Sequence, residues 1–600
     1  MMRKKVALMD KQVQTSSKNL FGRLFKYAKP YYLKYLLAIF IMILLVAGEL
    51  VVPYFLGLSL KILGQTPIEF NKILVLLFLG VADLGLVCVL SYAQTMILHN
   101  IGHKIIYDLR NEVLEHIQSL SHAQFNDVPT GKLVTRVTSD INVLFTLYTQ
   151  IMVSLLRNIV TIISVFVAMA LLNVHLTLLL LIVVPVLGIG SYIFRKYSRK
   201  MHRKVRDNIS NMNAFLSENI SGIKITQVFN QEDKKYEEFK QNNQQLKSSL
   251  LKEILIFGIF RPSIYILYLI SVVIVFWFGG NWAIEFNAGT GMIVLTYDLL
   301  YTFYQYISKF FNPIQTLADQ FNELQSSYAA AEKIFSILDL ETTIKDDPDA
   351  IDVKITGDIE FKDVWFSYIP GEWVLKGVSF HINPNDTIAF VGATGSGKTT
   401  ILSLIVRNYD IQKGQILIDG VDIKKIKLES LRSQIGQMLQ DVFLFSGTIL
   451  SNIQMNDDNI SFEEVKEASE YINASKFIDK LPNGYLEETR ERGNNFSLGQ
   501  RQLISFARTI VHKPTVMILD EATANIDTET EVLIQDSLEK IINNGTIIIV
   551  AHRLSTIQHA NKIFVFHNGE IIEEGNHQEL LKKQGRYYKL YKLQYADEKI

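Results

Sequence analysis

The sequence predicts an all-α membrane domain with six spanning helices, fused to an α/β domain. Hydrophobic residues make up 48% of the 600 residues, and the long apolar blocks are confined to the first half. From about Ile351 the pattern changes to short apolar strands alternating with helices, as in α/β domains. Lys+Arg and Asp+Glu both total 60, so the overall charge indicates no particular partner, and we expect no nucleic acid.

The composition divides the chain into four parts. Residues 1–34 form a basic tail and a short helix, because 20–32 mixes aromatic residues with three basic ones, a pattern typical of a helix in the membrane interface. The membrane domain follows over 35–340. An acidic, proline-containing break near Pro348 indicates a linker over 341–355, and 356–600 forms the α/β domain.

Six apolar segments are long enough to span a membrane. They are Tyr35–Leu58, Ile73–Leu98, Met152–Leu172, Leu176–Phe194, Ile254–Ile284 and Met292–Phe311. The two long connections, His99–Gln150 and Arg195–Glu253, have helical periodicity and predict helices that extend well beyond the bilayer.

The second long connection begins with a basic run, Arg195–Arg206, that contains no acid. By the positive-inside rule this end is cytoplasmic. An even number of spans then places the α/β domain in the cytoplasm. The compact layout and the absence of a transit peptide favour a multi-pass protein of a bacterial plasma membrane.

Three acidic residues lie inside apolar segments: Glu49, Asp83 and Asp298. A carboxylate within the membrane is costly, so each should face a cavity, a partner or a polar neighbour. One interpretation is a binding site for cationic amphiphiles; the other is that these acids neighbour head groups or hold helices together. The sequence does not rank the three acids by their chance of contacting substrate.

A glycine-rich loop between a strand and a helix predicts a phosphate-binding site. Glycines allow successive backbone N–H groups to face phosphate oxygens, and the helix N-terminus adds positive potential. Lys398 should reach the β- and γ-phosphates, and the Thr399 hydroxyl should coordinate Mg²⁺. The loop comprises Gly392, Ala393, Thr394, Gly395, Ser396, Gly397, Lys398, Thr399 and Thr400.

Four further positions complete the predicted ATP site. Asp520 and Glu521 end an apolar strand, where Asp520 should hold Mg²⁺ and Glu521 could accept a proton from attacking water. His552 follows another strand, expected to be a neighbour in the same sheet, and should lie near the γ-phosphate. Tyr368, at a strand end, is placed to stack on adenine.

These motifs together resemble the ATP-binding cassette (ABC) exporter family over nearly the whole chain. The family's elements occur in order along the sequence: Tyr368 (A-loop), Gly392–Thr400 (Walker A), Gln440 (Q-loop), Phe496–Gln500 (signature), Val516–Glu521 (Walker B), Asp527 (D-loop) and His552 (H-loop). The resemblance implies the type I exporter fold and places Ser497, Leu498, Gly499, Gln500 and Asp527 at ATP. It also implies that Gln440 senses Mg²⁺ and the nucleotide.

The resemblance further implies a mechanism in which two ATP-binding domains close head to tail over two ATPs. Closure would turn the membrane cavity from inward- to outward-facing, and hydrolysis would reset it. The helices that couple the two domains are expected near Gln118–Ala123 and Met212–Leu216. The cargo would be a hydrophobic or amphipathic small molecule, with membrane lipids around the protein. A lipid flippase, and an ATP-gated channel or regulatory ATP-binding subunit, are the alternatives.

One departure from the family pattern predicts the kind of partner. The signature reads F-S-L-G-Q instead of the family's L-S-G-G-Q, so Leu498 places a branched side chain where backbone should approach the γ-phosphate. The D-loop also departs, whereas Lys398, Glu521 and His552 are intact. This combination indicates one half of a heterodimeric exporter. Its partner would carry the consensus signature and lack the catalytic glutamate.

Overall fold

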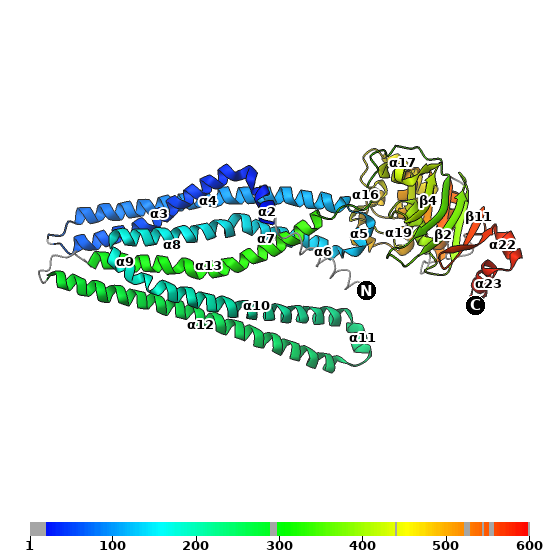
Figure 1. Cartoon of the computed structure of the whole chain (residues 1–600). Helices are drawn as coiled ribbons and strands as arrows, with labels where there is room; N and C mark the ends of the chain where they lie inside the picture. The colour runs from blue at the N-terminus through cyan, green and yellow to red at the C-terminus, as the bar shows by residue number, and fades with distance from the viewer. Residues whose placement is uncertain are drawn as a thin grey trace. The chain divides into compact units, whose positions relative to one another are not determined.

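The computed structural model divides into two compact units. The helical unit contains Met1–Ser119 and Val128–Glu341, and the α/β unit contains Leu120–Asp127 and Thr342–Ile600. The residues that the structure describes are 20–65, 67–287, 297–438, 441–520, 528–542, 545–550 and 557–597. Figure 1 shows the helices and strands of both units.

The helical unit begins with a short helix, α2 (Leu20–Ala28), that is separate from the long helix α3 (Tyr32–Leu63). A 3-10 turn containing Pro30 joins them, because proline lacks an N–H donor but is tolerated in the first turn of a helix. Arg23 in α2 forms an ion pair with Asp339 at 2.7 Å. These contacts fix α2; its position in the membrane interface remains a prediction.

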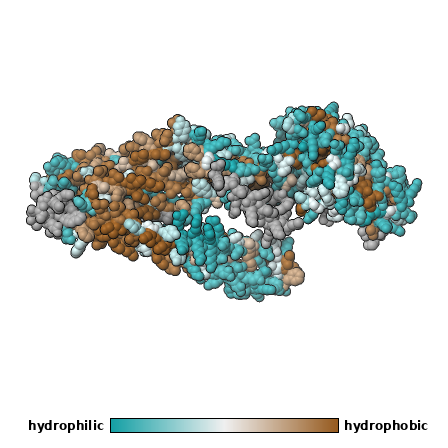
Figure 2. Space-filling model, in the orientation of Figure 1, coloured by the Kyte–Doolittle hydropathy of each residue, from teal (hydrophilic) through white to brown (hydrophobic). Residues whose placement is uncertain are grey.

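Helices of 8 to 56 residues form most of the rest of the helical unit. They are α4 (Phe70–Ser119), α8 (Met152–Leu172), α9 (Val174–Leu181), α10 (Val183–Ser221), α12 (Glu232–Asn287) and α13 (Tyr297–Leu338). Helix α3 packs against α4, α8 and α13, while α10 packs along α12 (Figure 1). Figure 2 shows a broad hydrophobic surface over the spanning parts of these helices and a hydrophilic surface where α10 and α12 approach α11.

Within the described residues, five stretches are long and apolar enough to cross a membrane. They are Leu20–Leu63, Phe70–Ser119, Thr130–Leu172, Val174–Ser221 and Glu232–Asn281. The sixth predicted span, Met292–Phe311, begins outside the described residues, and α13 continues it from Tyr297. That span therefore remains a prediction.

The fourth predicted span consists of two helices instead of one. Helix α9 is capped by Asn173, whose side chain accepts a hydrogen bond of 3.0 Å from the Leu176 N–H. The break between α9 and α10 falls at Ile182. Pro185 has no N–H to continue the helical hydrogen bonding toward residue 181, which explains a break at this point.

Short helices, α5 and α11, follow the cytoplasmic extensions of α4 and α10. The position of α11 differs from the position predicted for the second coupling helix. Helix α5 (His122–Asp127) belongs to the α/β unit, and the predicted segment Gln118–Ala123 covers only its first turn and the end of α4. The predicted segment Met212–Leu216 is not a separate short helix, because it lies within the last ten residues of α10. The helix instead ends at Gly222, and a short helix, α11 (Ile223–Val228), follows. The apolar periodicity continues across this end, so the sequence pattern does not indicate it.

The α/β unit contains a six-stranded sheet in the order β12-β11-β3-β10-β9-β6. Strands β3 (Thr387–Gly392), β6 (Ile435–Met438), β9 (Val516–Asp520), β10 (Thr546–Val550) and β11 (Lys562–His567) are parallel, and β12 (Glu570–Gly575) is an antiparallel edge. A second sheet, β2-β1-β4-β5, contains β1 (Ile359–Phe366), β2 (Leu375–Ile382), β4 (Lys413–Ile418) and β5 (Val421–Asp422).

The central strands are buried on both faces, as their continuous apolar runs predict. Ala389 and Val391 of β3 point into one core with Ile547 of β10. Ile388 and Phe390 point into the core on the other side of the sheet. This double burial holds the carboxyl ends of the central strands at one level, where the candidate site lies.

Candidate functional site

The predicted phosphate loop joins the end of β3 to helix α14 (Lys398–Ile405). Gly397 caps α14 with φ of 107°, and Gly395 has φ of 81°. These backbone conformations are costly for residues that carry a Cβ atom. The order of strand, glycine loop and helix is therefore confirmed, and the glycines are required by the backbone itself.

Lys398 is the side chain that organises this loop. Its side chain is 5% exposed, and Nζ donates hydrogen bonds to the carbonyls of Gly392 at 2.7 Å and Ala393 at 3.0 Å. Burial lowers the pKa of Lys398, an effect that the carboxylate of Asp520 partly opposes. The ammonium group is thus held inside the loop, on the sheet side.

The loop also contains a polar atom for which the described residues offer no partner. The Ser396 hydroxyl is buried and accepts and donates no hydrogen bond within the part of the chain that the structure describes. A Cβ atom on Gly392 would lie 2.9 Å from this hydroxyl and would collide with the Phe566 carbonyl. A buried hydroxyl beside a cradle that only glycine can form fits a phosphate group.

Asp520 lies two strands away from the loop at the same level of the sheet. Asp520 is the last residue of β9 and pairs in register with Val550 of β10. Val550 in turn pairs with Phe390 of β3. The expectation that the strand before His552 is a neighbour in the same sheet is confirmed by this register. Gln440, Glu521, Asp527 and His552 lie outside the described residues, so the positions of their side chains remain predictions.

Tyr368 lies two residues beyond β1 and is 46% exposed, as expected for a residue at a strand end. Its hydroxyl forms a hydrogen bond of 3.1 Å with the Thr400 hydroxyl, which connects it to α14. Its ring meets the rings of Phe366 and Tyr409 edge-on, at 4.9 and 5.1 Å between centroids. Partial burial raises the pKa of Tyr368. The ring is therefore held in place and still presents accessible surface.

The signature segment forms the start of helix α19 (Leu498–Val511). Ser497 and Gln500 form a capping box: the Ser497 hydroxyl accepts from the Gln500 N–H at 3.2 Å, and the Ser497 N–H donates to Gln500 Oε1 at 2.9 Å. Leu498 is the first helical residue and is partly exposed, whereas Gly499 is buried. The leucine side chain therefore stands at the open end of this helix.

A buried polar connection that no sequence motif indicates joins α19 to the segment that follows Gln440. Asn452 in helix α16 (Ile449–Gln454) is 1% exposed and exchanges two hydrogen bonds of 2.8 Å with the backbone of Phe445. Arg508 of α19 donates to the Asn452 carbonyl at 2.8 Å and to the Phe443 carbonyl at 3.1 Å. Burial lowers the pKa of Arg508. Neither residue belongs to a motif, so only the fold reveals them.

Replacing Asn452 by alanine should destabilise the α/β unit by about 2–3 kcal/mol, because it leaves partly buried backbone groups of Phe445 and a guanidinium N–H of Arg508 without partners. The midpoint of thermal unfolding of the full chain should fall by about 4–8 °C. Asn494→Ala, at an exposed position, is the matched control and should leave the midpoint unchanged. Equal midpoints for the two variants would contradict the role of Asn452.

One of the three intramembrane acids has a partner that sequence analysis overlooked. Glu49 in α3 forms an ion pair with Arg157 in α8. Next to it, Asp83 of α4 packs against Gly48, where an added Cβ atom would lie 3.1 Å from Asp83 Oδ1. One carboxylate oxygen each of Asp83 and Asp298 is buried with no hydrogen bond among the described residues. The Glu49 contact favours a role in holding helices together, and substrate contact remains a prediction for all three.

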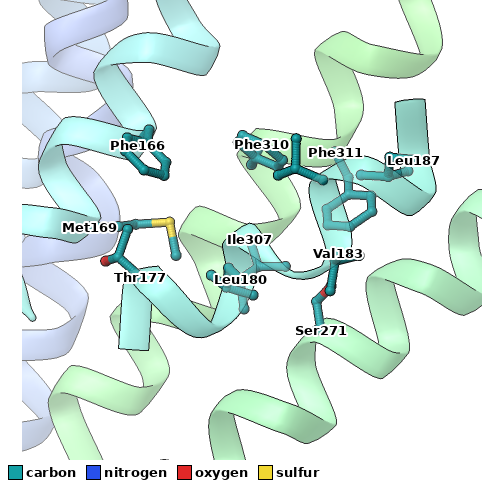
Figure 3. A pocket seen from close by; sticks show the side chains of 11 residues that line it. Phe166, Met169, Thr177, Leu180, Val183, Leu187, Ser271, Ile307, Phe310 and Phe311 are labelled. Atoms are coloured by element: carbon teal, nitrogen blue, oxygen red, sulfur yellow. The ribbon is translucent and has the colours of Figure 1, made fainter. Parts of the chain in front are cut away.

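An apolar cavity lies among the spanning helices (Figure 3). Its lining residues come from α8, α9, α10, α12 and α13, and none of the three acids is among them. The hydroxyls of Thr177 and Ser271 donate to carbonyls of their own helices, both at 2.8 Å. The lining is therefore almost purely hydrocarbon, including Phe166, Met169 and Phe310 (Figure 3).

Two family models match the chain. The model of the ABC transporter transmembrane region matches residues 35–314, and the ABC transporter model matches residues 375–524. The chain belongs to the ABC transporter family. It is a membrane-embedded half-transporter of the type I exporter fold, in which a transmembrane domain and an ATP-hydrolysing domain share one chain.

Individual relatives resemble the chain over most of its length. A probable multidrug resistance ABC transporter ATP-binding/permease protein of Bacillus subtilis, YheH, is 37% identical over 512 residues, covering 84% of this chain and 74% of the relative. An ATP-dependent lipid A-core flippase of Syntrophus aciditrophicus is 34% identical over 597 residues, covering 97% and 96%. The structure of a bacterial Atm1-family ABC exporter with ATP bound aligns with a TM-score of 0.75 at 25% identity, covering 94% of this chain and 98% of that chain.

Proposed function

We propose that this chain is the subunit of a heterodimeric exporter that supplies the catalytic glutamate, and that the pair exports hydrophobic or amphipathic compounds. The observation that carries the proposal is Leu498, which is partly exposed as the first residue of α19 in a chain whose Lys398, Glu521 and His552 are intact.

In this proposal ATP binds along the phosphate loop. The loop backbone over Gly392–Thr400 holds the phosphates, and the buried Ser396 hydroxyl gains a partner there. Lys398 turns its ammonium from the Gly392 and Ala393 carbonyls toward phosphate oxygens. The half-exposed ring of Tyr368 receives the adenine.

Mg²⁺ would be held by oxygen ligands from Thr399, Gln440 and Asp520, which is the ligand chemistry that this ion prefers. When bound, the ion neutralises charge on the phosphates. Thr399 is exposed on α14, and Asp520 lies at the carboxyl end of β9. Glu521 accepts the proton of the attacking water, and His552 contacts the γ-phosphate.

The leucine in the signature explains why a different partner is needed. A signature helix serves the ATP held by the opposite subunit, so Leu498 obstructs the site whose Walker A loop is the partner's. The loop and Glu521 of this chain instead face the partner's signature, which forms the competent site. ATP binding then drives closure only through its higher affinity for the closed state.

The cargo proposal rests on the relatives. The apolar cavity has an accessible volume of only about 20 Å³, which is too small to hold a drug-sized molecule in this conformation. YheH is named as a probable multidrug resistance transporter, which favours multidrug export. The name of the lipid A-core flippase supports a lipid flippase as the second candidate. A channel or regulatory subunit is disfavoured, because gating requires ATP binding more than turnover and this chain retains Glu521, the residue expected to support turnover.

The test compares ATP hydrolysis of the purified chain alone with that of the chain co-purified with a candidate partner. The chain alone should turn over ATP at least about tenfold more slowly than the pair, because each closed site of a homodimer meets Leu498. Leu498→Gly should raise the activity of the chain alone by a similar factor. This variant shortens a partly exposed side chain, so folding should be preserved.

Leu486→Gly is the matched control, because this leucine is 63% exposed. A buried leucine such as Leu503 would not be suitable. Leu486→Gly should leave the activity of the chain alone unchanged. Robust ATP turnover by the chain alone, with no gain from Leu498→Gly, would contradict the heterodimer and favour a homodimeric exporter.

A further inference from the structure

An open groove of about 890 Å³ lies along residues 96–108 of α4, beside the turn that precedes α3. It lies within the helical unit and is separate from the apolar cavity and from the ATP site. Its polar and aromatic lining residues are Tyr31, His99, Asn100, His103, Lys104, Tyr107 and Asp108. Residues 100, 104, 107 and 108 share one face of α4, because they follow the spacing of helical turns.

The groove lies at the level where two apolar segments end. Tyr31 stands just before the apolar part of α3, and His99 follows directly after the apolar run that ends at Leu98. Aromatic and basic residues at such boundaries face the lipid head groups. We therefore expect the groove to meet the cytoplasmic leaflet at head-group depth.

The cationic part of the groove is held in place and available. His103 packs on Phe145 with 4.7 Å between ring centroids, and His99 meets the same ring at 5.6 Å. His99 Nδ1 donates to the Thr95 carbonyl at 3.0 Å. Lys104 is exposed and forms no ion pair within the residues that the structure describes. A free ammonium beside two oriented imidazoles suits a phosphate group.

The other part of the groove suits a cation. Asp108 lies one turn beyond Lys104 on α4, and its carboxylate faces the Tyr31 hydroxyl. Tyr107 is 67% exposed and adds an aromatic surface next to it. A carboxylate with aromatic neighbours attracts an ammonium group. One helical turn thus separates a phosphate-binding element from an ammonium-binding element.

We propose that this groove binds the head group of a phosphatidylethanolamine molecule, with the phosphate at Lys104 and His103 and the ammonium at Asp108. The phosphate and ammonium of ethanolamine are joined by two carbons, so both can be reached from adjacent turns of one helix. This lipid is a resident of the transporter surface and not its cargo. The assignment is independent of the heterodimer and of the cargo proposed above.

The test measures lipid retention by native mass spectrometry of the full chain in detergent, without nucleotide. Phosphatidylethanolamine, phosphatidylglycerol and phosphatidylcholine are added in turn, and apparent affinities are compared. We expect phosphatidylethanolamine to bind most tightly. Lys104→Gln and Asp108→Asn should each weaken its binding by about tenfold, the effect of losing one charge-assisted contact. Lys104→Arg should retain binding, since it keeps the positive charge.

Lys252→Gln is the matched control. Lys252 is an exposed lysine just before the predicted fifth span, so it tests unspecific attraction of a surface charge to lipid. It should leave retention unchanged. Equal weakening by Lys252→Gln, or equal affinity for all three lipids, would overturn the proposal. Equal binding of phosphatidylcholine and phosphatidylethanolamine would overturn a hydrogen bond from the ammonium to Asp108, because the choline nitrogen is positively charged but carries no N–H.

Discussion

Lys398→Ala should lower the rate of ATP hydrolysis by about a hundred- to a thousandfold, which is the usual cost of removing one preorganised donor at a reacting group. The structure holds this ammonium within the phosphate loop by two carbonyls, and it turns from them toward the phosphate oxygens when ATP binds. Steady-state ATPase activity of the pair, or of the Leu498→Gly chain, measures the effect.

Because Lys398 is buried, the thermal unfolding midpoint of the variant must be compared with that of the parent. An unchanged midpoint assigns the loss of activity to the missing ammonium and not to a collapsed loop. Lys466→Ala, which removes an exposed lysine of the same unit, is the control and should retain full activity. An active Lys398→Ala enzyme would contradict the proposed contact with the phosphates.

Glu521→Gln should silence ATP hydrolysis by the pair by about a hundredfold or more while leaving ATP binding intact, because the amide cannot accept a proton from water. The amide keeps the size of the side chain, so folding should not change. Single-turnover assays and the amount of unhydrolysed ATP that co-purifies with the variant measure the two effects separately.

The corresponding change in the partner should have little effect, because this proposal places the only competent glutamate in this chain. Glu463→Gln, at an exposed helical position, is the matched control. If Glu521→Gln retained activity while a carboxylate of the partner proved essential, the assignment of the competent site would be reversed.

The sequence was sufficient to predict features that depend on local chemistry. The buried strand β3, the loop with Gly395 and Gly397, and helix α14 follow from residues that are adjacent in the chain. The sequence also indicated that β10 and β3 belong to the same sheet, because both strands are continuously apolar and end before candidate site residues. Local patterns carry this information because backbone conformation and strand burial restrict which residues are tolerated.

Features that depend on distant contacts could not be predicted. The pairing of Glu49 with Arg157 joins residues 108 positions apart, and the contact of Arg508 with Asn452 joins residues 56 positions apart. The end of α10 at Gly222 was also missed, because glycine is tolerated inside helices and the residues around it keep the helical period. Only the packed structure distinguishes these possibilities.

Helix α12 has a mechanical consequence that follows from its length of 56 residues. The 30 residues before Pro262 rise by about 45 Å, at the usual 1.5 Å per residue. If this part pivots by about 10° at the proline, where the hydrogen bonding of the helix is interrupted, its free end moves by about 8 Å. Helix α11 lies at that end. A small rotation in the membrane thus becomes a displacement larger than the 5.4 Å rise of a helical turn.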